Sequence, residues 1–429
     1  MNNIAYIFLF FSTFLHAHVI EVGTNKPVKS IKKALSLAKD GDTVLVHKGI
    51  YKEGNIIIDK KIVFMGKNFP ILDGQKKYEV LSIKADSVVV QGFKVIRSGY
   101  ASLEDPCAIK VYNKNNVVIQ NNVLDDNFFG IYIQNGRDCL IKNNKIVAYG
   151  KEEQQIGNGI HCWKSNNLQV IGNSISGHRD GIYFEFVTNS VIWRNISANN
   201  IRYGLHFMFS NDDAYISNVF KNNGAGVAVM FTKNVKMFNN YFEENWGDSA
   251  YGLFLKEISD SHIIGNKFYK NTSGIHMEGT NRIWIEKNIF EANGWAMKIQ
   301  ASCVDNEIVR NNFIGNTFDM GTNGSLVLNK FDTNYWDKYE GYDLNKECRW
   351  CSSLDLRNKT ADDIFKEFSY TTRQDVRSAQ KYCVNVRKLN VNELDILDSM
   401  EQETSKRHNF HAFDLNYYKE LYEFYGDDH

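Results

Sequence analysis

The chain has 429 residues, enough to bury a large core. Its 50 Lys and Arg residues balance its 50 Asp and Glu residues, so the net charge is zero. This balance implies no general attraction to nucleic acid or to an anionic membrane surface. Beyond the first twenty residues, no apolar run is long enough to span a bilayer.

Residues 1–17 are typical of a secretory signal peptide. An apolar run extends from Ile4 to Leu15, and Ala17 supplies a small residue at a cleavage point. The basic residues that usually precede such a run are absent, so an uncleaved N-terminal anchor is the alternative. In both cases we expect the rest of the chain to be exported, with no transmembrane segment after signal cleavage.

Residues 18–105 are predicted to form an N-terminal cap and the first coils of a repeat. Apolar residues recur at helical spacing between Ser30 and Lys39, and Asp40-Gly41 ends that pattern. A short amphipathic helix here would cover the first strand edges, which otherwise stay unpaired. Runs rich in Val and Ile, such as Val19 to Val22, predict strands on both sides of the helix.

Residues 106–336 repeat one short pattern, a glycine followed by an aliphatic residue. The glycines recur at intervals of 22 to 29 residues. They are Gly130, Gly159, Gly181, Gly204, Gly226, Gly252 and Gly274. A second series, of asparagines that each end a β-prone run, has the same period. It comprises Asn122, Asn144, Asn173, Asn195, Asn218, Asn240, Asn266 and Asn288. Both series lengthen at the same two places, so the extra residues lie in Val147 to Asn158 and in Glu243 to Ala250.

This pattern predicts a single-stranded parallel β-helix, an all-β solenoid. A period near 22 residues with three strand-like runs matches one coil of such a fold. Parallel crossovers are generally right-handed, so we expect a right-handed helix. Asparagines at one corner can hydrogen-bond along the stack, and they tolerate the left-handed backbone of such turns. Ankyrin, TPR and leucine-rich repeats are disfavoured because their helical halves are missing.

Alternation along each strand identifies which residues point away from the core. The first residue after each glycine is aliphatic and faces inward, so the second and fourth face outward. His206 and Met208 then share one outward face, and Met230 is the neighbour of Met208 in the next coil. Thioethers select Cu(I), and imidazole suits copper generally. We therefore predict a metal site at His206, Met208 and Met230, with an apolar patch covered by a loop or a partner as the alternative.

The other histidines and methionines of the repeat, and its cysteines, are interpreted as ordinary surface or core residues rather than as metal ligands. His161 and His276 are expected to be isolated surface histidines, whereas Met277 and Met297 fall on inward positions. Cys162 takes the place of a core aliphatic residue.

A polysaccharide-active β-helix protein, of the uronate lyase or C5-epimerase type, is the alternative function. Such enzymes need a clustered base, acid and charge stabiliser, often with Ca²⁺. The candidate side chains are scattered over several coils, and the pair Asp212-Asp213 is expected to be solvated in a turn. The candidates are Asp180, Glu185, Asp212, Asp213, Glu278 and Lys298. A surface adhesin would show long Thr- and Ser-rich repeats, which the sequence lacks.

Residues 337–429 lose the repeat and form a polar extension to which the sequence assigns no fold. A helix is predicted near Val391 to Glu401. The pair Cys348 and Cys351 could form a local disulfide, act as a redox or metal pair, or remain two free thiols.

Residues 18 to 345 resemble the NosD family of periplasmic maturation proteins for nitrous oxide reductase. The block with most of the resemblance runs from Arg202 to Ser210, supported by Asp180-Gly181-Ile182-Tyr183 and Ala228-Val229-Met230-Phe231. Further matching segments are Gly41-Asp42-Thr43-Val44, Gly49-Ile50-Tyr51, Leu72-Asp73-Gly74, Asn334-Tyr335-Trp336-Asp337 and Gly341-Tyr342-Asp343-Leu344.

The resemblance implies a periplasmic protein that is not itself an enzyme. It would handle Cu(I) transiently, with or without sulfur, or scaffold partners while the copper–sulfide centre of nitrous oxide reductase is assembled. The implied partners are an ABC-type permease and ATPase, a copper chaperone lipoprotein and the reductase. One departure stands out: family members continue into a leucine-rich C-terminal region, whereas Cys348 to His429 is polar and charged here. This difference puts the contact with a permease in doubt and leaves another periplasmic partner open for the extension.

Overall fold

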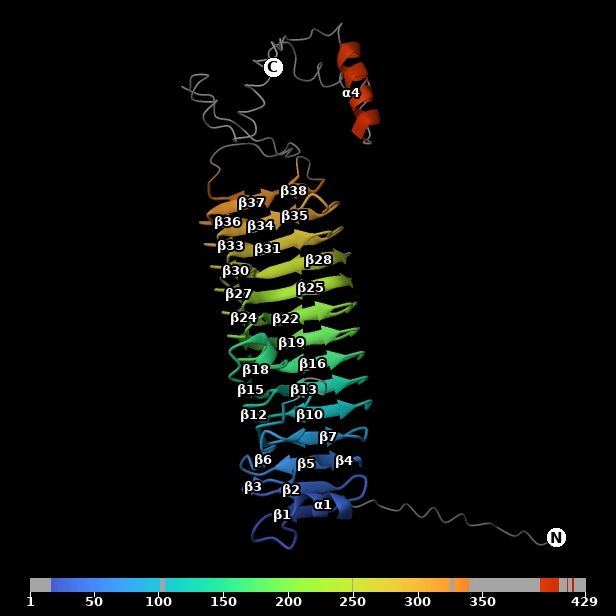
Figure 1. The fold of residues 1–429 in the computed structure, drawn as a ribbon, viewed down its shortest axis with the longest axis vertical. Coiled ribbons are helices and arrows are strands. Elements are labelled where there is room, and N and C mark those ends of the chain that lie inside the picture. Colours follow the sequence, from blue (N-terminus) through green and yellow to red (C-terminus); the bar gives the residue numbers. More distant parts are fainter. Residues whose placement is uncertain are drawn as a thin grey trace, which may run out of the picture. The chain divides into compact units, whose positions relative to one another are not determined.

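The structure is a computed structural model that describes residues 17–100, 105–248, 250–324, 328–338 and 394–408, together with residues 415 and 419. Within these ranges the chain winds into a parallel β-helix whose strands stack into three long sheets (Figure 1). The predicted all-β solenoid is thereby confirmed. The predicted signal peptide up to residue 16, Leu326-Val327, Gly341 to Leu344 and the pair Cys348 and Cys351 lie outside the described residues.

Each coil contributes one strand to each sheet, and every neighbouring pair is parallel. The 14-stranded sheet, here sheet A, contains β1 (Val19–Val22), β2 (Thr43–Val46), β5 (Val63–Gly66), β8 (Val89–Gln91), β11 (Val118–Gln120), β14 (Leu140–Lys142), β17 (Gln169–Ile171), β20 (Val191–Trp193), β23 (Ala214–Ile216), β26 (Lys236–Phe238), β29 (His262–Ile264), β32 (Trp284–Glu286), β35 (Glu307–Val309) and β38 (Lys330–Asp332). The 13-stranded sheet B contains β3 (Ile50–Tyr51), β6 (Ile71–Asp73), β9 (Lys94–Ile96), β12 (Val123–Asp125), β15 (Lys145–Val147), β18 (Ser174–Ser176), β21 (Ile196–Ala198), β24 (Val219–Lys221), β27 (Tyr241–Glu243), β30 (Lys267–Tyr269), β33 (Ile289–Glu291), β36 (Asn312–Ile314) and β39 (Tyr335–Trp336).

Sheet C carries the glycine repeat. It has 12 strands among the described residues. They are β4 (Ile56–Ile58), β7 (Leu81–Ile83), β10 (Cys107–Tyr112), β13 (Phe129–Gln134), β16 (Ile160–Trp163), β19 (Asp180–Glu185), β22 (Tyr203–Met208), β25 (Ala225–Lys233), β28 (Leu253–Ser259), β31 (Ser273–Glu278), β34 (Trp295–Ile299) and β37 (Phe318–Thr322). The two predicted insertions lie between sheets B and C, and the first contains a short 3-10 helix, η1 (Glu153–Gln155).

The predicted N-terminal helix is α1 (Ile31–Leu37). The Ser30 side chain accepts a hydrogen bond from the backbone N–H of Lys33 and so caps the helix. Its apolar side, which includes Ile31 and Leu35, is buried, and the helix contacts β1, β2 and β4. The helix therefore lies against the first strands of the stack, as expected.

The asparagine series forms a continuous buried ladder at one corner. In Asn218, for example, the side-chain amide donates to Asn240 Oδ1 at 3.0 Å and to the Ile192 carbonyl at 2.9 Å. The sequence predicted left-handed backbone at the ladder asparagines themselves, and this prediction is wrong. The left-handed backbone falls on the residue before each ladder asparagine, such as Ser217 with a φ of 53°. The ladder asparagine itself is the hydrogen-bonding element.

A second asparagine ladder, which the sequence interpretation missed, follows the strands of sheet B. Its members are Asn200, Asn223, Asn245, Asn271, Asn293 and Asn316, and each amide donates to the next Oδ1.

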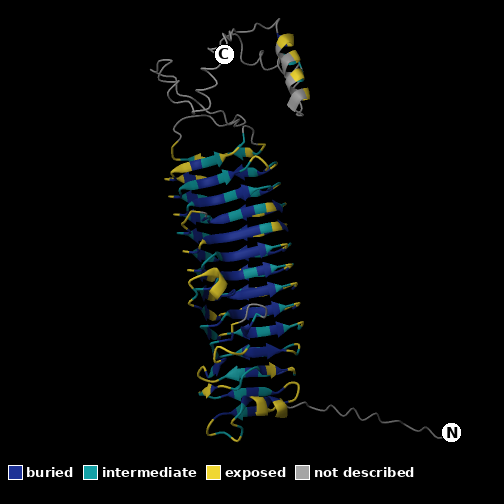
Figure 2. Ribbon diagram, in the orientation of Figure 1, coloured by how far each residue is buried: buried dark blue, intermediate teal, exposed yellow. Residues whose placement is uncertain are grey.

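Between the corners the core holds a column of stacked aromatic rings. Phe242, Phe268 and Phe290 stack with centroids 4.6 and 4.9 Å apart. Met277, Met297 and Cys162 are fully buried, as predicted. Figure 2 shows buried residues in the strands along the whole stack.

The C-terminal extension is described at α4 (Leu394–His408), which overlaps the predicted helix. Contacts divide the chain into two units, Met1–Cys351 and Ser352–His429. Among the described residues, no helix combines the length and apolarity that crossing a bilayer requires.

Candidate functional site

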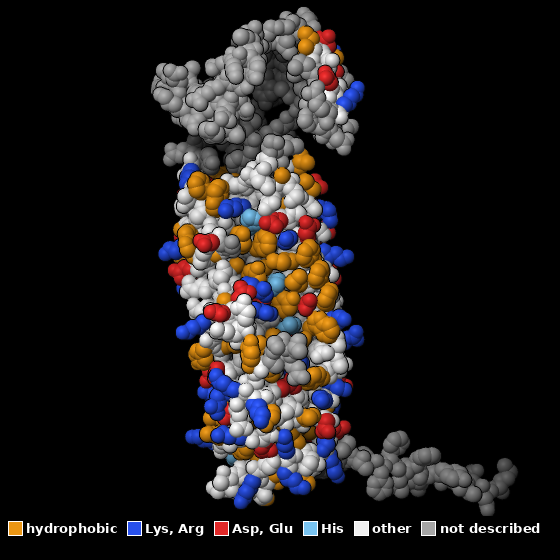
Figure 3. All heavy atoms as spheres, in the orientation of Figure 1, with side chains coloured by type: hydrophobic (Ala, Val, Ile, Leu, Met, Phe, Trp, Pro, Cys, Tyr) orange, Lys and Arg blue, Asp and Glu red, His pale blue; other side chains and the backbone are white. Residues whose placement is uncertain are grey.

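Two columns of side chains run along the outward face of sheet C. The first column is the second position after each glycine, and the strand register aligns its members coil by coil. They are Lys110, Tyr132, His161, Tyr183, His206, Ala228, Phe254, His276 and Lys298. The second column, two residues further along each strand, comprises Tyr112, Gln134, Trp163, Glu185, Met208, Met230, Lys256 and Glu278. Figure 3 shows hydrophobic side chains and histidines gathered over the middle coils of this face.

The register places the three predicted metal ligands together, as the sequence indicated. Met208 pairs directly with Met230, and His206 lies two residues before Met208 on β22. The expected exposure is wrong for the histidine, because His206 is only 5% exposed. The rings of Tyr183 and Tyr203 each lie 4.8 Å from the imidazole and cover it. Met208 and Met230 are half-buried, so only the thioether side of this site faces solvent.

The imidazole of His206 is buried without hydrogen bonds. Neither Nδ1 nor Nε2 has a hydrogen-bond partner. Nδ1 lies 3.5 Å from Asp180 Oδ2, which is a close electrostatic contact whose geometry is not that of a hydrogen bond. Buried polar atoms are nearly always satisfied, so this ring is an exception that calls for an explanation.

Asp180 is a buried carboxylate held by Arg202. The guanidinium donates to both carboxylate oxygens, at 2.9 and 2.6 Å. Burial opposes ionisation, but the hydrogen bonds and charge of Arg202, together with the electrostatic contact of His206, outweigh it and lower the pKa of Asp180 to about 2. A permanent negative charge therefore lies beside Nδ1 of His206. It favours the proton on Nδ1 and leaves the Nε2 lone pair available.

The thioether of Met208 already has one polar neighbour. The Tyr183 hydroxyl donates to Met208 Sδ at 3.5 Å. No group of three or more His, Cys, Asp and Glu side chains that could hold a metal occurs among the described residues. The donor set here is one imidazole and two thioethers, which suits Cu(I) and lacks the oxygen ligands of harder cations. The chemistry of these side chains therefore fits Cu(I).

Three phenylalanines beside this site were missed by the sequence interpretation. Phe186, Phe209 and Phe231 directly follow the second column, and their rings stack with centroids 5.2 Å apart. They are 44%, 39% and 41% exposed. All three adopt left-handed backbone, with φ values of 54°, 50° and 53°, which is costly for a bulky residue. The recurrence of Phe five residues after Gly181, Gly204 and Gly226 is the signal that could have found them.

The two other histidines of the first column differ from their predicted surface role. His161 is buried, stacks on Tyr132 at 4.3 Å, and has no hydrogen-bond partner at Nε2. Burial lowers its pKa to about 3, so it is neutral. His276 is half-buried, and its Nε2 lies 3.1 Å from Glu278 Oε1. Neither has a methionine pair beside it in the second column.

The carboxylates considered for a polysaccharide enzyme do not form one cluster. Asp180 is paired with Arg202, and Glu278 with His276 four coils further along. The expectation of a solvated Asp213 is wrong, because its side chain is buried. Asp213 Oδ1 accepts from the Ser190 backbone at 2.7 Å, while Oδ2 has no partner. Burial raises the pKa of Asp213 to about 8. It belongs to the corner of the fold rather than to an outward groove.

Comparison with known proteins divides the chain at the end of the coil stack. Residues 148–341 match the family model described as periplasmic copper-binding protein (NosD). This segment contains all three predicted ligands, and it is similar to the NosD family. Residues 327–429 match the model of a different family, FemAB. The polar extension is therefore similar to the FemAB family, and this similarity coincides with its departure from the leucine-rich end expected of NosD proteins.

The curated relatives match this second segment. The chain is 32% identical over 104 residues to the aminoacyltransferase FemB of Staphylococcus epidermidis, covering 24% of this chain and 25% of that protein. It is 34% identical over 89 residues to the aminoacyltransferase FemA of Staphylococcus aureus, covering 21% of each. The chain thus spans about a quarter of the length of these relatives.

Similar solved structures share the coil stack. The A-module of the Azotobacter vinelandii mannuronan C-5 epimerase AlgE6 aligns with a TM-score of 0.51 at 15% identity, covering 72% of this chain and 92% of that one. The catalytic unit of a Streptomyces thermodiastaticus α-1,3-glucanase aligns with a TM-score of 0.53 at 11% identity, covering 71% and 66%. At these identities the likeness is one of fold alone.

Proposed function

We propose that this protein, whose residues 148–341 are a NosD-type β-helix, binds Cu(I) at His206, Met208 and Met230 and passes it on during assembly of a copper centre. The observation that carries the proposal is the buried imidazole of His206, which has no hydrogen-bond partner beside a register-matched pair of methionines. A Cu(I) ion bound at Nε2 would satisfy the atom that the fold leaves unpaired. Copper is here the cargo, not a resident cofactor, and the protein is not proposed to catalyse a reaction.

The surroundings support uptake and release rather than permanent storage. The thioethers are half-buried and neutral, so they bind Cu(I) without a proton being lost. Asp180 holds the imidazole in the tautomer that ligates through Nε2, in the way carboxylates commonly support ligating histidines. The ring of Tyr203 lies 4.8 Å from the imidazole of His206 and limits access of water to it.

The exposed phenylalanine ladder offers a place for a partner to dock beside the methionines. Phe209 and Phe231 come directly after Met208 and Met230, so a protein seated on them would lie next to the thioethers. Strained backbone at exposed aromatic residues is typical of functional surfaces. We propose that the copper donor, a lipoprotein chaperone, or the acceptor, nitrous oxide reductase, docks here in the periplasm, with an ABC-type permease and ATPase serving the same assembly.

The test is an anaerobic Cu(I) competition titration against a chromophoric chelator, on residues 18–429. The parent protein is expected to bind one Cu(I), and the His206→Ala, Met208→Leu, Met230→Leu triple variant is expected to lose at least a hundredfold in affinity. Alanine is tolerated in the first column, since Ala228 occupies the next coil, and leucine conserves the volume of methionine.

The matched control is the double variant His276→Ala, Met277→Leu on β31. It removes a first-column histidine and an adjacent methionine that faces the core, so it should bind copper like the parent. The thermal midpoint of each variant shows that the fold is intact. Absence of Cu(I) binding by the folded parent, or equal binding by both variants, would overturn the copper assignment.

A further inference from the structure

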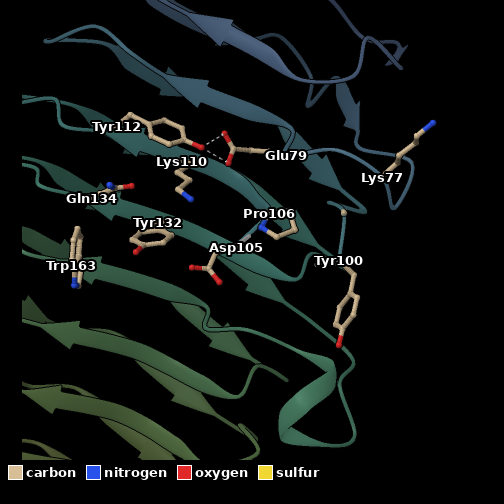
Figure 4. A pocket seen from close by; sticks show the side chains of 11 residues that line it. Lys77, Glu79, Tyr100, Asp105, Pro106, Lys110, Tyr112, Tyr132, Gln134 and Trp163 are labelled. Carbon is tan, nitrogen blue, oxygen red and sulfur yellow. Dashed lines mark hydrogen bonds between the residues drawn. The ribbon is translucent and has the colours of Figure 1, made fainter. Parts of the chain in front are cut away.

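A second site lies on the same outward face, near the N-terminal end of sheet C. A pocket of about 630 Å³ opens over β10, β13 and β16, within the volume range of small-molecule sites (Figure 4). Its floor is formed by consecutive members of the two columns, including Lys110, Tyr132 and Gln134. Glu79 and Asp105 enter from the segments before β7 and β10. None of these residues belongs to the copper site.

The charged groups of the pocket are held in place but leave binding capacity free. The Tyr112 hydroxyl lies 3.1 and 2.9 Å from the two oxygens of Glu79, and the Ser82 hydroxyl also donates to Oε1. Lys110 Nζ lies 4.6 Å from the Tyr132 ring centroid and 5.1 Å from that of Tyr112. Among the described residues, it makes no ion pair. An ammonium group held by ring faces alone keeps its three N–H donors for a ligand.

The signs of charge in the pocket cancel, which bears on the kind of ligand. The lining holds two lysines, Lys110 and, at the edge with its amine directed away from the carboxylates, Lys77 (Figure 4). Two carboxylates, Glu79 and Asp105, the tyrosine hydroxyls and the Gln134 amide complete the polar lining. Such a site offers donors and acceptors in equal measure. It matches a ligand whose groups both donate and accept, as alcohol hydroxyls do, better than a simple anion or cation.

Aromatic rings form the rim. Trp163 is half-buried with Lys164 Nζ 4.4 Å above its ring, and Tyr100 is 61% exposed. The Tyr100 ring is held edge-on against Phe128 at 4.8 Å, and its hydroxyl donates to the carbonyl of Gln154 in the first insertion at 3.1 Å. Rings fixed in this way present flat apolar faces with wet edges. The C–H face of a pyranose ring packs on such surfaces while its hydroxyls reach polar neighbours.

We propose that this pocket binds a saccharide, with one sugar ring against Trp163 and its hydroxyls hydrogen-bonded by Lys110, Glu79 and Asp105. The inference is independent of the copper function and would survive its failure. Pyranose hydroxyls and an apolar ring face are shared by neutral sugars and by sugar acids, and Lys110 could serve a ring hydroxyl or a ring carboxylate. Neutral and acidic oligosaccharide probes distinguish these two classes of sugar.

The experiment is isothermal titration calorimetry of residues 18–429 with neutral probes (cellotriose, maltotriose and chitotriose) and acidic probes (trigalacturonate and a mannuronate trimer). At least one trisaccharide is expected to bind with a Kd of roughly 1 mM or tighter. Trp163→Ala should weaken that binding at least tenfold, and Glu79→Gln should weaken it less. If the acidic probes bind more tightly and Lys110→Ala removes this preference, Lys110 binds the carboxylate of the sugar acid.

The matched control is Trp193→Ala. Trp193 lies on sheet A and carries a cation over its ring, Arg194 at 4.6 Å, as Trp163 carries Lys164. This variant should bind the sugar like the parent, and Trp163→Ala should bind Cu(I) like the parent. Failure of every probe to bind the folded parent, or equal loss in the two tryptophan variants, would overturn the proposal and leave the copper result unaffected.

Discussion

The asparagine ladder between sheets A and B and two histidines of the first column on sheet C, His161 and His206, are both buried polar groups, but they differ in hydrogen bonding. Each ladder amide is fully engaged, as Asn218 is with its neighbours in both adjacent coils. In the first column, His161 lacks a partner at Nε2 and His206 lacks one at both nitrogens. A satisfied polar column stabilises the scaffold. An unsatisfied group is an exception that calls for an explanation, and His206 is the one that lies beside a register-matched pair of methionines.

The largest expected effect breaks the satisfied column. Asn218→Ala removes the acceptor for the Asn195 backbone and amide, and the donor to Ile192 and Asn240. We expect a loss of about 4 kcal/mol in the free energy of unfolding, measured by denaturant titration, because several buried groups are left unpaired. Asn222→Gly in the same coil is the control, since Asn222 is exposed with a φ of 51° that suits glycine. A loss below about 1 kcal/mol would remove the distinction between the columns.

The next effect concerns a corner residue that is itself unsatisfied. Asp213 has a pKa raised to about 8 by burial, above its unfolded value, so its ionisation destabilises the fold increasingly from about pH 4 to pH 8. Asp213→Asn should therefore stabilise the protein by on the order of 3 kcal/mol at pH 8, and by little at pH 4. Asn306, at the equivalent position four coils further along, shows that asparagine fits, because its amide donates to a carbonyl.

Thermal midpoints of the parent and of Asp213→Asn, measured from about pH 4 to pH 8, test this prediction. Asp212→Asn, at the exposed neighbouring residue, is the control and should show no comparable gain. A gain for Asp213→Asn that does not change with pH would contradict the assignment of a buried, neutral carboxyl group.

A smaller effect tests the charge beneath His206. The folded pKa of Asp180 is about 2, below its unfolded value, so its contribution is present above about pH 4 and is lost as the pH falls toward 2. Asp180→Asn should cost about 2 kcal/mol at pH 7, a difference that should vanish near pH 2. It should also weaken Cu(I) binding, because Nδ1 of His206 loses its anionic neighbour.

The control for this prediction is Asp260→Asn. Asp260 and Arg282 form the same bidentate pair on the surface, at 2.7 and 3.0 Å, where solvent screens the charges. Its stability cost should be clearly smaller and its copper affinity unchanged. Equal effects in both variants would mean that Asp180 serves the scaffold alone.

The smallest effect on stability is expected at the exposed phenylalanines. Phe231→Asn loses one ring stack but relieves left-handed strain, so the free energy of unfolding should change by less than about 1 kcal/mol. Phe242→Asn, in the buried aromatic column, should prevent stable folding. If the ladder is a docking surface, Phe231→Asn binds copper normally and transfers it more slowly to its partner, as followed by stopped-flow absorbance. Unchanged transfer would remove partner docking from this surface.

The fold was predictable from sequence because each coil repeats the same requirements at a fixed period. The glycine series, the ladder from Asn122 and the capping helix all follow from local patterns that neighbouring coils enforce on one another. The alignment of Met208 with Met230 followed from the same period. The second asparagine ladder has an equally regular spacing, so it was also predictable, but the sequence interpretation did not recognise it.

The surroundings of the site were not predictable from one strand's alternation. An outward position was taken to be exposed, but the cover over His206 comes from Tyr183 in the preceding coil and from Tyr203 on its own strand. Asp213 was expected in a solvated turn because adjacent acids usually are, whereas the ladder geometry draws its carboxyl group inward. The aromatic rim at Tyr100 depends on the first insertion, whose path no periodicity specifies.

The parallel register has a mechanical consequence. All the hydrogen bonds between one coil and the next point along the axis of the stack, so a pull on the chain at either end of the coil region peels the terminal coil away and breaks one layer of bonds at a time. The stack should then peel coil by coil, each step releasing roughly 70 Å of chain. The proposed copper site spans two adjacent coils through Met208 and Met230, so peeling that reaches this one layer would divide the ligand set.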